Sequence, residues 1–504
     1  MRKTVLAVAI MITATLLTAR AQDVKATLAA ASAAMGSVQN VQYSGTGTNA
    51  AFGQAYAPGG AWPVFKVTDY NVALDYVGNT MRVLIERTNP DGPARGGGGI
   101  PLFGAGNPQK LNQALNNRTA WNVNTNPAPG ADPNVPQQAA LTARLLEFWT
   151  TPHAVLNAAD AATEANTATL AGKVISFTMF ATPVKVTLGA DNSVSRVEYR
   201  TAQPVVGDTL TEIAYTQYKQ FPRGKFPMHI TVRQGGFPIL DIAVTNVEIN
   251  GVIKSVPIPQ SVQASYTANP PPARNAAPTP PPQNVVTTKV ADGVYYLTGG
   301  SHHSMLVEFA DHLVLFETPQ TDARAMAVIE AARKTVPSKP IRYVVNSHNH
   351  FDHLGGVRAA MAEGITIITA AANKPYYEQI AKMPHTINPD LLAKSPKTPT
   401  VEAVAAKRVM SDATQTLEIY PLPTNHTSTM LVGYLPKAKV LFEVDVYTPG
   451  AANAPPPATP AAANPVTAAF YDQLQVMKLD VSQILPGHGP RMVTVADLKA
   501  AIAR

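Results

Sequence analysis

The sequence predicts two domains: a β-rich α+β domain with a curved antiparallel sheet over residues 22–255, and an α/β domain over residues 287–504. Three observations support this division. Apolar and polar residues alternate with period two from Val174 to Ile249, as in successive half-exposed strands. The Pro-rich stretch 256–286 favours an extended linker that cannot build a core. Beyond it, the apolar strand pattern Ile341–Val345 leads through a loop into a helical pattern, as in layered α/β domains.

The first 21 residues have the features of a secretory signal peptide. A basic start is followed by an apolar run from Thr4 to Leu17, and Ala19-Arg20-Ala21 provides a small-x-small cleavage site. The apolar run is too short to span a bilayer comfortably, so we expect cleavage after Ala21 and no membrane anchor. The expected location is therefore the periplasm or the outside of the cell. Because the sequence has no cysteine, its stability must come from packed cores rather than disulfides.

The charge of the chain gives little indication of a charged partner. The formal net charge is +7, and three of the positive charges, Arg2, Lys3 and Arg20, belong to the predicted signal peptide. The sequence contains no basic cluster with interleaved aromatic residues. We therefore expect no nucleic-acid partner, and a small-molecule substrate instead.

The first domain should begin with an Ala-rich helix. Residues 89–138 are rich in Pro, Gly, Asn and Ala and predict mostly loop. Thr151 and Pro152 are typical of the N-cap and the first position of a helix. The expected helices are 24–35, 141–148 and 152–162, and the expected strands are 65–76, 81–87, 174–180, 184–188, 194–200, 210–218, 229–233 and 240–249.

An N-terminal helix followed by consecutive antiparallel strands predicts a curved sheet of a shape that suits an apolar ligand. In the order of its elements, and in no motif, this domain is similar to the periplasmic lipoprotein-carrier fold. A β-rich accessory or dimerisation domain is the alternative.

The stretch His348-Asn-His350-Phe-Asp352-His353 is the strongest functional signal in the chain. Three imidazoles and one carboxylate lie within six residues, between an apolar strand and a Gly-Gly helix entry. Neutral imidazole and carboxylate are ligands that Zn²⁺, Fe and Mn accept. A solvated turn would explain a lone histidine, but four such groups on one loop repel one another without a cation. The spacing therefore predicts a metal site.

Further candidate ligands stand at the ends of other apolar strands. His426 follows the strand pattern 416–422, Asp445 closes the pattern 440–445, and His488 follows Ile484-Leu485. Each signal is weak alone, because an isolated His or Asp after a strand is usually structural. In a layered α/β domain, however, such loops gather at one edge, so these side chains can converge.

On these motifs, in this order, residues 287–504 resemble the metallo-β-lactamase-fold hydrolase superfamily. The resemblance implies a four-layer αββα sandwich with two metals at the sheet edge. It also implies the ligands: His348, His350 and His426 for one metal, Asp352, His353 and His488 for the second, and Asp445 as the bridge between them.

The resemblance singles out three more residues and one segment. Glu317 ends a strand where the superfamily usually has Asp, so its carboxylate either bonds a metal ligand or nearby backbone amides. His302 and His303 lie in a turn that the superfamily often places over the site, which makes them candidates for substrate contact. The Pro-rich segment Val446–Pro465 is expected to border the substrate mouth. The remaining histidines, His153, His229, His312 and His385, are expected to be surface or core residues.

Two divalent cations about 3.5–4 Å apart can share a water and lower its pKa toward 7. We therefore expect a metal-bridging hydroxide that hydrolyses an ester, lactone, lactam, thioester or phosphodiester, with Asp352 moving a proton. Two Zn²⁺ are the expected cofactors, with Fe or Mn as alternatives. Without cysteine, the second metal cannot have the thiolate ligand of the most studied lactamases, and Asp445 looks more like the glyoxalase-II, lactonase and phosphodiesterase branches.

Two other functions remain open from the sequence. Sulfur dioxygenases keep much of the same ligand set around a single Fe, so a mononuclear iron oxidoreductase is one alternative. The other is an apolar-ligand-binding periplasmic protein whose metal domain is ancillary.

Overall fold

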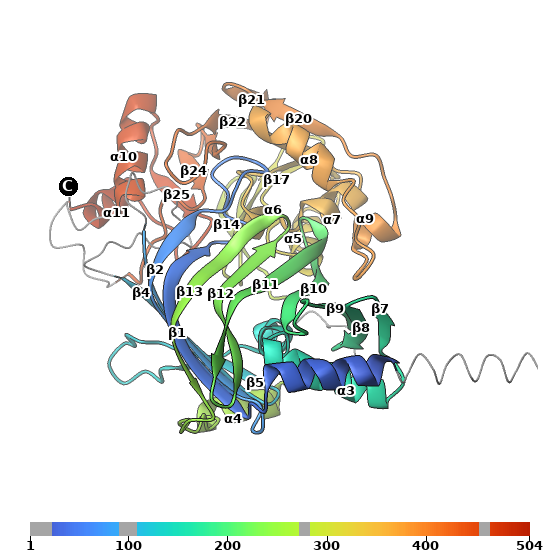
Figure 1. Cartoon of the computed structure of the whole chain (residues 1–504). Coiled ribbons are helices and arrows are strands. Elements are labelled where there is room, and N and C mark those ends of the chain that lie inside the picture. Colours follow the sequence, from blue (N-terminus) through green and yellow to red (C-terminus); the bar gives the residue numbers. More distant parts are fainter. Residues whose placement is uncertain (1–22, 90–107, 272–282, 453–463, 504) are drawn as a thin grey trace, which may run out of the picture.

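The computed structural model describes residues 23–89, 108–271, 283–452 and 464–503 (Figure 1). The predicted signal peptide lies outside the described residues, as do the centres of the predicted linker and of the predicted rim segment. Within the described part, no helix has both the length and the apolar character needed to cross a membrane. The strands form three sheets, of 13, seven and five strands.

A single antiparallel sheet of 13 strands builds the first domain, as predicted, and its strands bend strongly (Figure 1). Nearly every strand pairs with its neighbours in sequence, and β1 pairs with β13 to join the two halves. The strands are β1 (Asn40–Ala50), β2 (Val64–Asp75), β3 (Thr80–Thr88), β4 (Gln109–Asn116), β5 (Thr119–Val123), β6 (Asn134–Pro136), β7 (Thr169–Ala171), β8 (Val174–Met179), β9 (Thr182–Leu188), β10 (Val194–Gln203), β11 (Gly207–Phe221), β12 (Gly224–Gln234) and β13 (Phe237–Ile249).

The helices of this domain pack with the sheet in one hydrophobic core. Leu28 in the helical segment 23–35, Phe148, Val155 and Tyr266 belong to the same buried cluster as the strand residues. The helices that follow this segment are η1 (Gln138–Ala140), α2 (Leu141–Trp149), α3 (Pro152–Glu164) and α4 (Gln260–Ala268). Burial of these apolar faces is what holds the short helices, since isolated helices of this length are marginal in water.

Thr151 stands at the N-cap of α3 and Pro152 at its first position, as predicted, although Thr151 Oγ1 donates to Phe148 O at 2.7 Å and makes no capping bond. The region predicted as mostly loop contains three short strands among its described residues, β4, β5 and β6, and β4 pairs with β3. The prediction of an extended linker was wrong in part, because α4 forms there and Tyr266 Oη accepts a hydrogen bond from Ala120 N at 2.9 Å.

The C-terminal domain has two facing sheets with helices on both outer sides, which confirms the predicted four-layer αββα sandwich. One core between the sheets contains Met305, Phe316 and Phe442, and another core between the seven-stranded sheet and its helices contains Ile329 and Met361. The seven-stranded sheet comprises β14 (Val286–Ala291), β15 (Val294–Thr298), β16 (Ser304–Glu308), β17 (Leu313–Phe316), β18 (Ile341–Val345), β19 (Thr366–Ala370) and β20 (Val401–Val404).

The five-stranded sheet comprises β21 (Arg408–Ser411), β22 (Thr416–Pro421), β23 (Leu431–Leu435), β24 (Val440–Glu443) and β25 (Gln483–Pro486). The helices are α5 (Asp322–Thr335), α6 (Phe351–Leu354), α7 (Val357–Ala362), η2 (Ala371–Asn373), α8 (Lys374–Ile380), α9 (Leu391–Lys394), α10 (Pro465–Met477) and α11 (Val495–Ala501). Strands β18 and β19 are parallel in the first sheet, and β24 and β25 are parallel in the second. The loops after β18 and β24 meet at one edge, where His348 Nε2 lies 3.3 Å from Asp445 Oδ2.

The two domains contact each other through the turn between β10 and β11. Val205 is 1% exposed and packs in the core of the C-terminal domain. Asp208 N donates to Pro384 O at 2.9 Å, and the Asp208 carboxylate accepts from Thr386 N at 3.0 Å. The connection between β1 and β2 makes a second contact, in which Gln54 Nε2 donates to Asp352 Oδ1.

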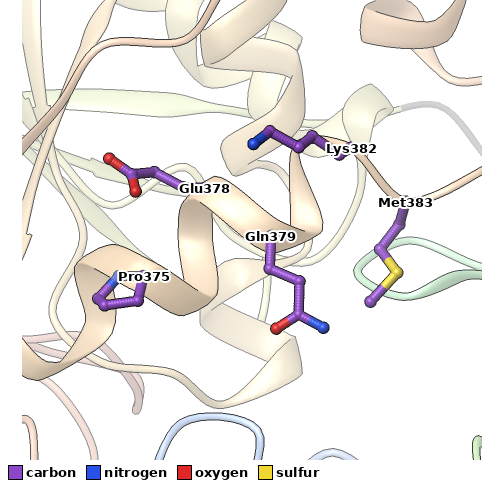
Figure 2. A pocket seen from close by; sticks show the side chains of 5 residues that line it. All are labelled: Pro375, Glu378, Gln379, Lys382 and Met383. Atoms are coloured by element: carbon purple, nitrogen blue, oxygen red, sulfur yellow. The ribbon is translucent and has the colours of Figure 1, made fainter.

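An open hollow lies on the surface of α8, close to this contact. It is lined by Pro375, Glu378, Gln379, Lys382 and Met383 (Figure 2). None of these residues belongs to a cluster of possible metal ligands among the described residues, and we therefore place the functional site elsewhere.

His153 in α3 should make the stability of the first domain depend on pH. Its ring is 5% exposed and stacks on Phe226, and burial lowers the pKa of His153 to about 4. The pKa in the unfolded chain is about 6.5. Because the folded pKa is the lower one, the unfolded state binds the proton first as the pH falls, and stability is lost between pH 6.5 and pH 4.

The measurement is the free energy of unfolding in urea, at pH 7 and at pH 4.5, for the parent protein and for His153→Gln. Between these two pH values, we expect the parent protein to lose roughly 2 kcal/mol more than the variant loses. Taking the difference removes the contributions of all other titrating groups. Equal losses in both proteins would show that burial does not lower the pKa of His153 in the fold.

Candidate metal centre

The predicted metal ligands converge at one edge of the αββα sandwich, in loops that follow strands and, for Asp352 and His353, in the short helix α6 that begins at the end of the ligand loop. Together they form two clusters in which the candidate ligand atoms lie within 4.8 Å of one another. The first donor group is His348, His350, His426 and Asp445, and the second donor group is His302, Asp352, His353 and His488. The first group is fully buried, whereas Asp352 and His488 in the second group are partly exposed. Solvent therefore reaches the cluster from the side of the second group.

Asp445 lies between the two groups and contacts both. Its Oδ2 is 3.3 Å from His348 Nε2, 3.1 Å from His426 Nε2 and 3.0 Å from His353 Nε2. Its Oδ1 is 2.7 Å from His488 Nε2. The backbone of Asp445 is left-handed, with φ +61°, a conformation that costs a non-glycine residue energy and is frequent at functional sites. One carboxylate thus has the position that a bridging ligand requires.

The donor atoms of the two groups are better placed to bind a cation than to hydrogen-bond with one another. His426 Nε2 lies 3.2 Å from His348 Nε2, and His488 Nε2 lies 3.2 Å from His353 Nε2. The Nδ1 atom of His350 is buried and has no hydrogen-bond partner. Burial lowers the pKa of His348 to about 4 and also lowers that of His350, so both rings are neutral and present lone pairs. Neutral imidazoles around a carboxylate are the donor set that Zn²⁺ prefers.

The pKa of His353 shifts in the opposite direction. Burial lowers its pKa, but the nearby carboxylates of Asp445 and Asp352 outweigh burial and raise the pKa well above the usual value. Its proton supplies the positive charge that the two carboxylates need. Metal binding at ligands of this kind displaces such protons.

Outer hydrogen bonds orient most of these imidazoles. In each case one ring nitrogen contacts an oxygen outside the cluster while the other faces inward, which is how proteins fix the tautomer of a metal-binding histidine. The pairs are His348 Nδ1 with Ser347 Oγ at 2.9 Å, His350 Nε2 with Ala55 O at 3.2 Å, His353 Nδ1 with Glu317 Oε2 at 3.1 Å and His488 Nδ1 with Ser301 O at 2.8 Å.

Glu317 makes both of the contacts that the sequence left as alternatives. It is fully buried at the end of β17, and its Oε1 accepts from Ser347 N at 2.6 Å. Its Oε2 lies 3.1 Å from His353 Nδ1. The longer side chain of Glu therefore reaches a candidate metal ligand while it also holds the backbone of the ligand loop.

The neighbouring residues His302 and His303 point to different places. His302 Nε2 lies 3.2 Å from Asp352 Oδ2, so this ring borders the second donor group. His303 is turned away: its Nδ1 lies 2.6 Å from Tyr296 Oη and its Nε2 lies 3.2 Å from Gly300 O. The structure thus brings His302 to the cluster and gives His303 a bracing position in the turn, while substrate contact by His302 stays a prediction. The other four histidines lie outside both donor groups.

The first domain supplies contacts that the sequence did not indicate. Gln54 Nε2 donates to Asp352 Oδ1 at 2.8 Å, although the two residues are 298 positions apart. Burial raises the pKa of Asp352, but the charge of His353 and the hydrogen bond from His302 outweigh burial and keep the pKa below its usual value. Asp352 is therefore an ionised carboxylate held from both sides. A Gln in a connecting loop gives no sequence signal for such a role.

The predicted rim segment is described only at its two ends. Val446 and Tyr447 are buried in the core between the sheets, directly after Asp445. Its centre, residues 453–463, lies outside the described residues. The substrate-mouth role of this segment stays a prediction.

Solved structures similar to this chain include two metallo-β-lactamases. One, from Pontibacter korlensis, is 24% identical with a TM-score of 0.33, and the alignment covers 44% of this chain and 98% of that chain. The other is the metallo-β-lactamase FIM-1 from Pseudomonas aeruginosa in its mono-zinc form, which is 22% identical with a TM-score of 0.33 and coverages of 44% and 96%.

Two curated relatives match short stretches of the chain. A linear primary-alkylsulfatase from Pseudomonas sp. is 27% identical over 106 residues, which are 21% of this chain and 15% of the relative. The alkyl/aryl-sulfatase BDS1 from Saccharomyces cerevisiae is 32% identical over 76 residues, which are 15% of this chain and 12% of the relative. The chain therefore spans only a small part of the length of both relatives.

The family model of the metallo-β-lactamase superfamily matches residues 297–442. This range holds the strands β16 to β23 and the ligand loop from His348 to His353, and it ends just before Asp445. The match coincides with the αββα sandwich and with the edge where the donors converge. The C-terminal region thus matches the metallo-β-lactamase superfamily over residues 297–442.

Proposed function

We propose that this protein is a hydrolase that binds two metal ions around Asp445. The metal that we propose is Zn²⁺. The contact of the Asp445 carboxylate with imidazoles of both donor groups carries this proposal. His348, His350 and His426 would hold one ion, and Asp352, His353 and His488 would hold the other. Asp445 would contact both, as a bridging ligand does in two-metal hydrolytic sites.

Two divalent cations bound there would lower the pKa of a shared water toward 7 and polarise the bond under attack. The residues of the chain contribute orientation and proton transfer. Asp352 is ionised, and its side chain is 29% exposed, so its Oδ2 can accept a proton and release it to solvent or to a leaving group. His302 Nε2, at 3.2 Å from that oxygen, is placed to take part in the same transfer.

The substrate that we propose is a small molecule with a hydrolysable ester-type bond. Esters, lactones, lactams, thioesters and phosphodiesters all place an electrophilic centre beside an oxygen that a cation can polarise. The two relatives are named as alkyl sulfatases, which adds sulfate esters to this set. We also propose export to the periplasm or beyond, because the first 21 residues read as a signal peptide. A carrier role for the first domain has less support, since its helices and sheet fill one packed core.

The proposal is tested by metal analysis together with a substrate panel. We expect the purified full chain to contain two Zn²⁺ and to hydrolyse at least one ester, lactone, lactam, thioester, phosphodiester or alkyl sulfate. A chelator should abolish hydrolysis, and added Zn²⁺ should restore it. His229→Ala is the control, because His229 lies outside the donor groups and pairs with Asp241 at 2.8 Å. A single Fe per chain with oxygen uptake on a persulfide would replace the hydrolase with the iron oxidoreductase.

A further inference from the structure

The connection between β1 and β2 of the first domain, residues 51–63, lies directly against the ligand loop of the metal centre. Gly53 O accepts from Phe351 N at 3.0 Å, and Gln54 Nε2 donates to Asp352 Oδ1 at 2.8 Å. Ala55 O accepts from Asn349 Nδ2 at 2.8 Å and lies 3.2 Å from His350 Nε2. Three successive residues of the connection thus contact four successive residues of the ligand loop. Figure 1 shows the bent strands of the first domain reaching the C-terminal domain.

The same connection also holds the loop of His426. Tyr56 O accepts from Ser428 N at 2.9 Å and from Thr427 Oγ1 at 3.1 Å. Thr427 Oγ1 is in turn 2.8 Å from Asn349 Oδ1, which links this loop back to the ligand loop. The connection therefore joins the two loops that carry the imidazoles of the first donor group.

An aromatic cluster fixes the connection in place. Phe351, between His350 and Asp352 in sequence, packs against Phe52 with a ring-centroid distance of 5.4 Å and against Trp62 at 5.3 Å. Trp62 is 6% exposed and also contacts Phe237 of β13 at 5.2 Å. Gly53 has φ +81°, and a Cβ there would lie 2.8 Å from the Phe351 side chain. The packing of the connection against Phe351 therefore requires glycine at position 53, because there is no room for a side chain.

These contacts decide how two predicted metal ligands present their atoms. When His350 Nε2 donates to Ala55 O, the proton sits on Nε2 and the buried, unpartnered Nδ1 is left with its lone pair for an ion. Gln54 Nε2 donates a hydrogen bond to Asp352 Oδ1, and the other carboxylate oxygen, Oδ2, faces His302 and His353. Groups that orient metal ligands in this way typically change metal affinity by about 10–100-fold.

We propose that residues 51–63 are a positioning element of the metal centre, with Gln54 as the positioning residue of Asp352. The C-terminal domain then depends on the first domain for full metal affinity, which explains why a β-rich domain precedes it in the same chain. This inference rests on the proposed two-metal site. The first domain then supports metal binding and does not bind a separate ligand of its own.

The test measures Zn²⁺ binding to the full chain by equilibrium dialysis, with no need for a substrate. Gln54→Leu removes the amide that holds Asp352 but keeps the backbone contacts, so we expect the affinity of one of the two ions to fall by about 10–100-fold. Gly53→Val displaces the backbone that contacts both ligand residues, so both affinities should fall. Gln220→Leu, the same substitution at an exposed position near the end of β11, should leave both unchanged.

The outcomes separate this inference from the proposed function. If the parent chain binds two Zn²⁺ and Gln54→Leu binds both with parental affinity, the positioning role is wrong and the hydrolase proposal stands. If the parent chain binds no metal, the proposed function itself fails. A general loss of stability would lower both affinities in Gln54→Leu equally, and that result would also overturn the assignment. Should Gly53→Val fail to fold, Gln54→Leu decides the question alone.

Discussion

Asp445→Asn is expected to reduce kcat/KM by at least about a hundredfold and to lower the metal content from two ions per chain toward one. The amide is nearly the same size as the carboxylate but carries no negative charge. Removing several kcal/mol of charge stabilisation corresponds to two or more factors of ten in rate. The loss should be large because Asp445 is 4% exposed and its Oδ2 lies within 3.3 Å of three imidazoles.

The charge of Asp445 is well defined without an ion. Burial raises its pKa, but the charges of His353 and His426 and the hydrogen bonds from the surrounding imidazoles outweigh burial and hold the pKa well below the usual value. The Asn variant therefore removes a full negative charge at any pH near neutrality.

A matched control for this variant is Asp480→Asn. Asp480 pairs with Lys439 on the surface, and its side chain is 74% exposed. We expect it to keep both ions and full activity. Two ions with parental activity in Asp445→Asn would show that the carboxylate does not bridge, and the assignment of the donor groups would have to change.

The convergence of the candidate metal ligands could be predicted from sequence because each stands near the end of a strand. The motif from His348 to His353 follows β18, whose pairing with its neighbours decides where the motif begins. His426, Asp445 and His488 follow strands of the second sheet, and layered domains bring such loops to one edge. Strand pattern indicated that these side chains could converge, and the family resemblance supplied the assignment of each one to a metal, which stays a prediction.

Other features of the site could not be predicted because they depend on packing between distant segments. The sequence gives no reason to distinguish His302 from His303. In the fold, the ring of His302 faces Asp352 and the ring of His303 faces Tyr296. Gln54 and Ala55 have no periodicity or motif that marks them, since their role arises only when the first domain docks. Strands β4 to β6 were missed for a related reason: their Gln- and Asn-rich segments lack the apolar alternation on which strand prediction rests.

Arg324→Met should strongly destabilise the C-terminal domain while leaving every predicted metal ligand in place. Arg324 in α5 is 1% exposed, and its guanidinium donates to Asn284 O at 2.6 Å, to His302 O at 3.0 Å and to Thr298 O at 3.3 Å. Methionine fills the space of the stem but donates no hydrogen bond. The bond to His302 O is buried and the other two are partly buried. An unpaired buried carbonyl costs about 1–3 kcal/mol, so we expect a loss of about 2–3 kcal/mol in the free energy of unfolding.

The measurement is urea unfolding at pH 7, with Arg333→Met as the control on the same helix. Arg333 is 46% exposed in its side chain and pairs with Glu363 on the surface, so its loss should cost no more than about 1 kcal/mol. Arg324→Lys should rescue only part of the loss, because one ammonium cannot reach three carbonyls as a planar guanidinium does. Since one of those carbonyls belongs to His302, the Arg324→Met variant should also loosen the turn that places His302 beside Asp352. Equal stability of the two Met variants would mean that the three carbonyls find other donors, and the turn would not depend on Arg324.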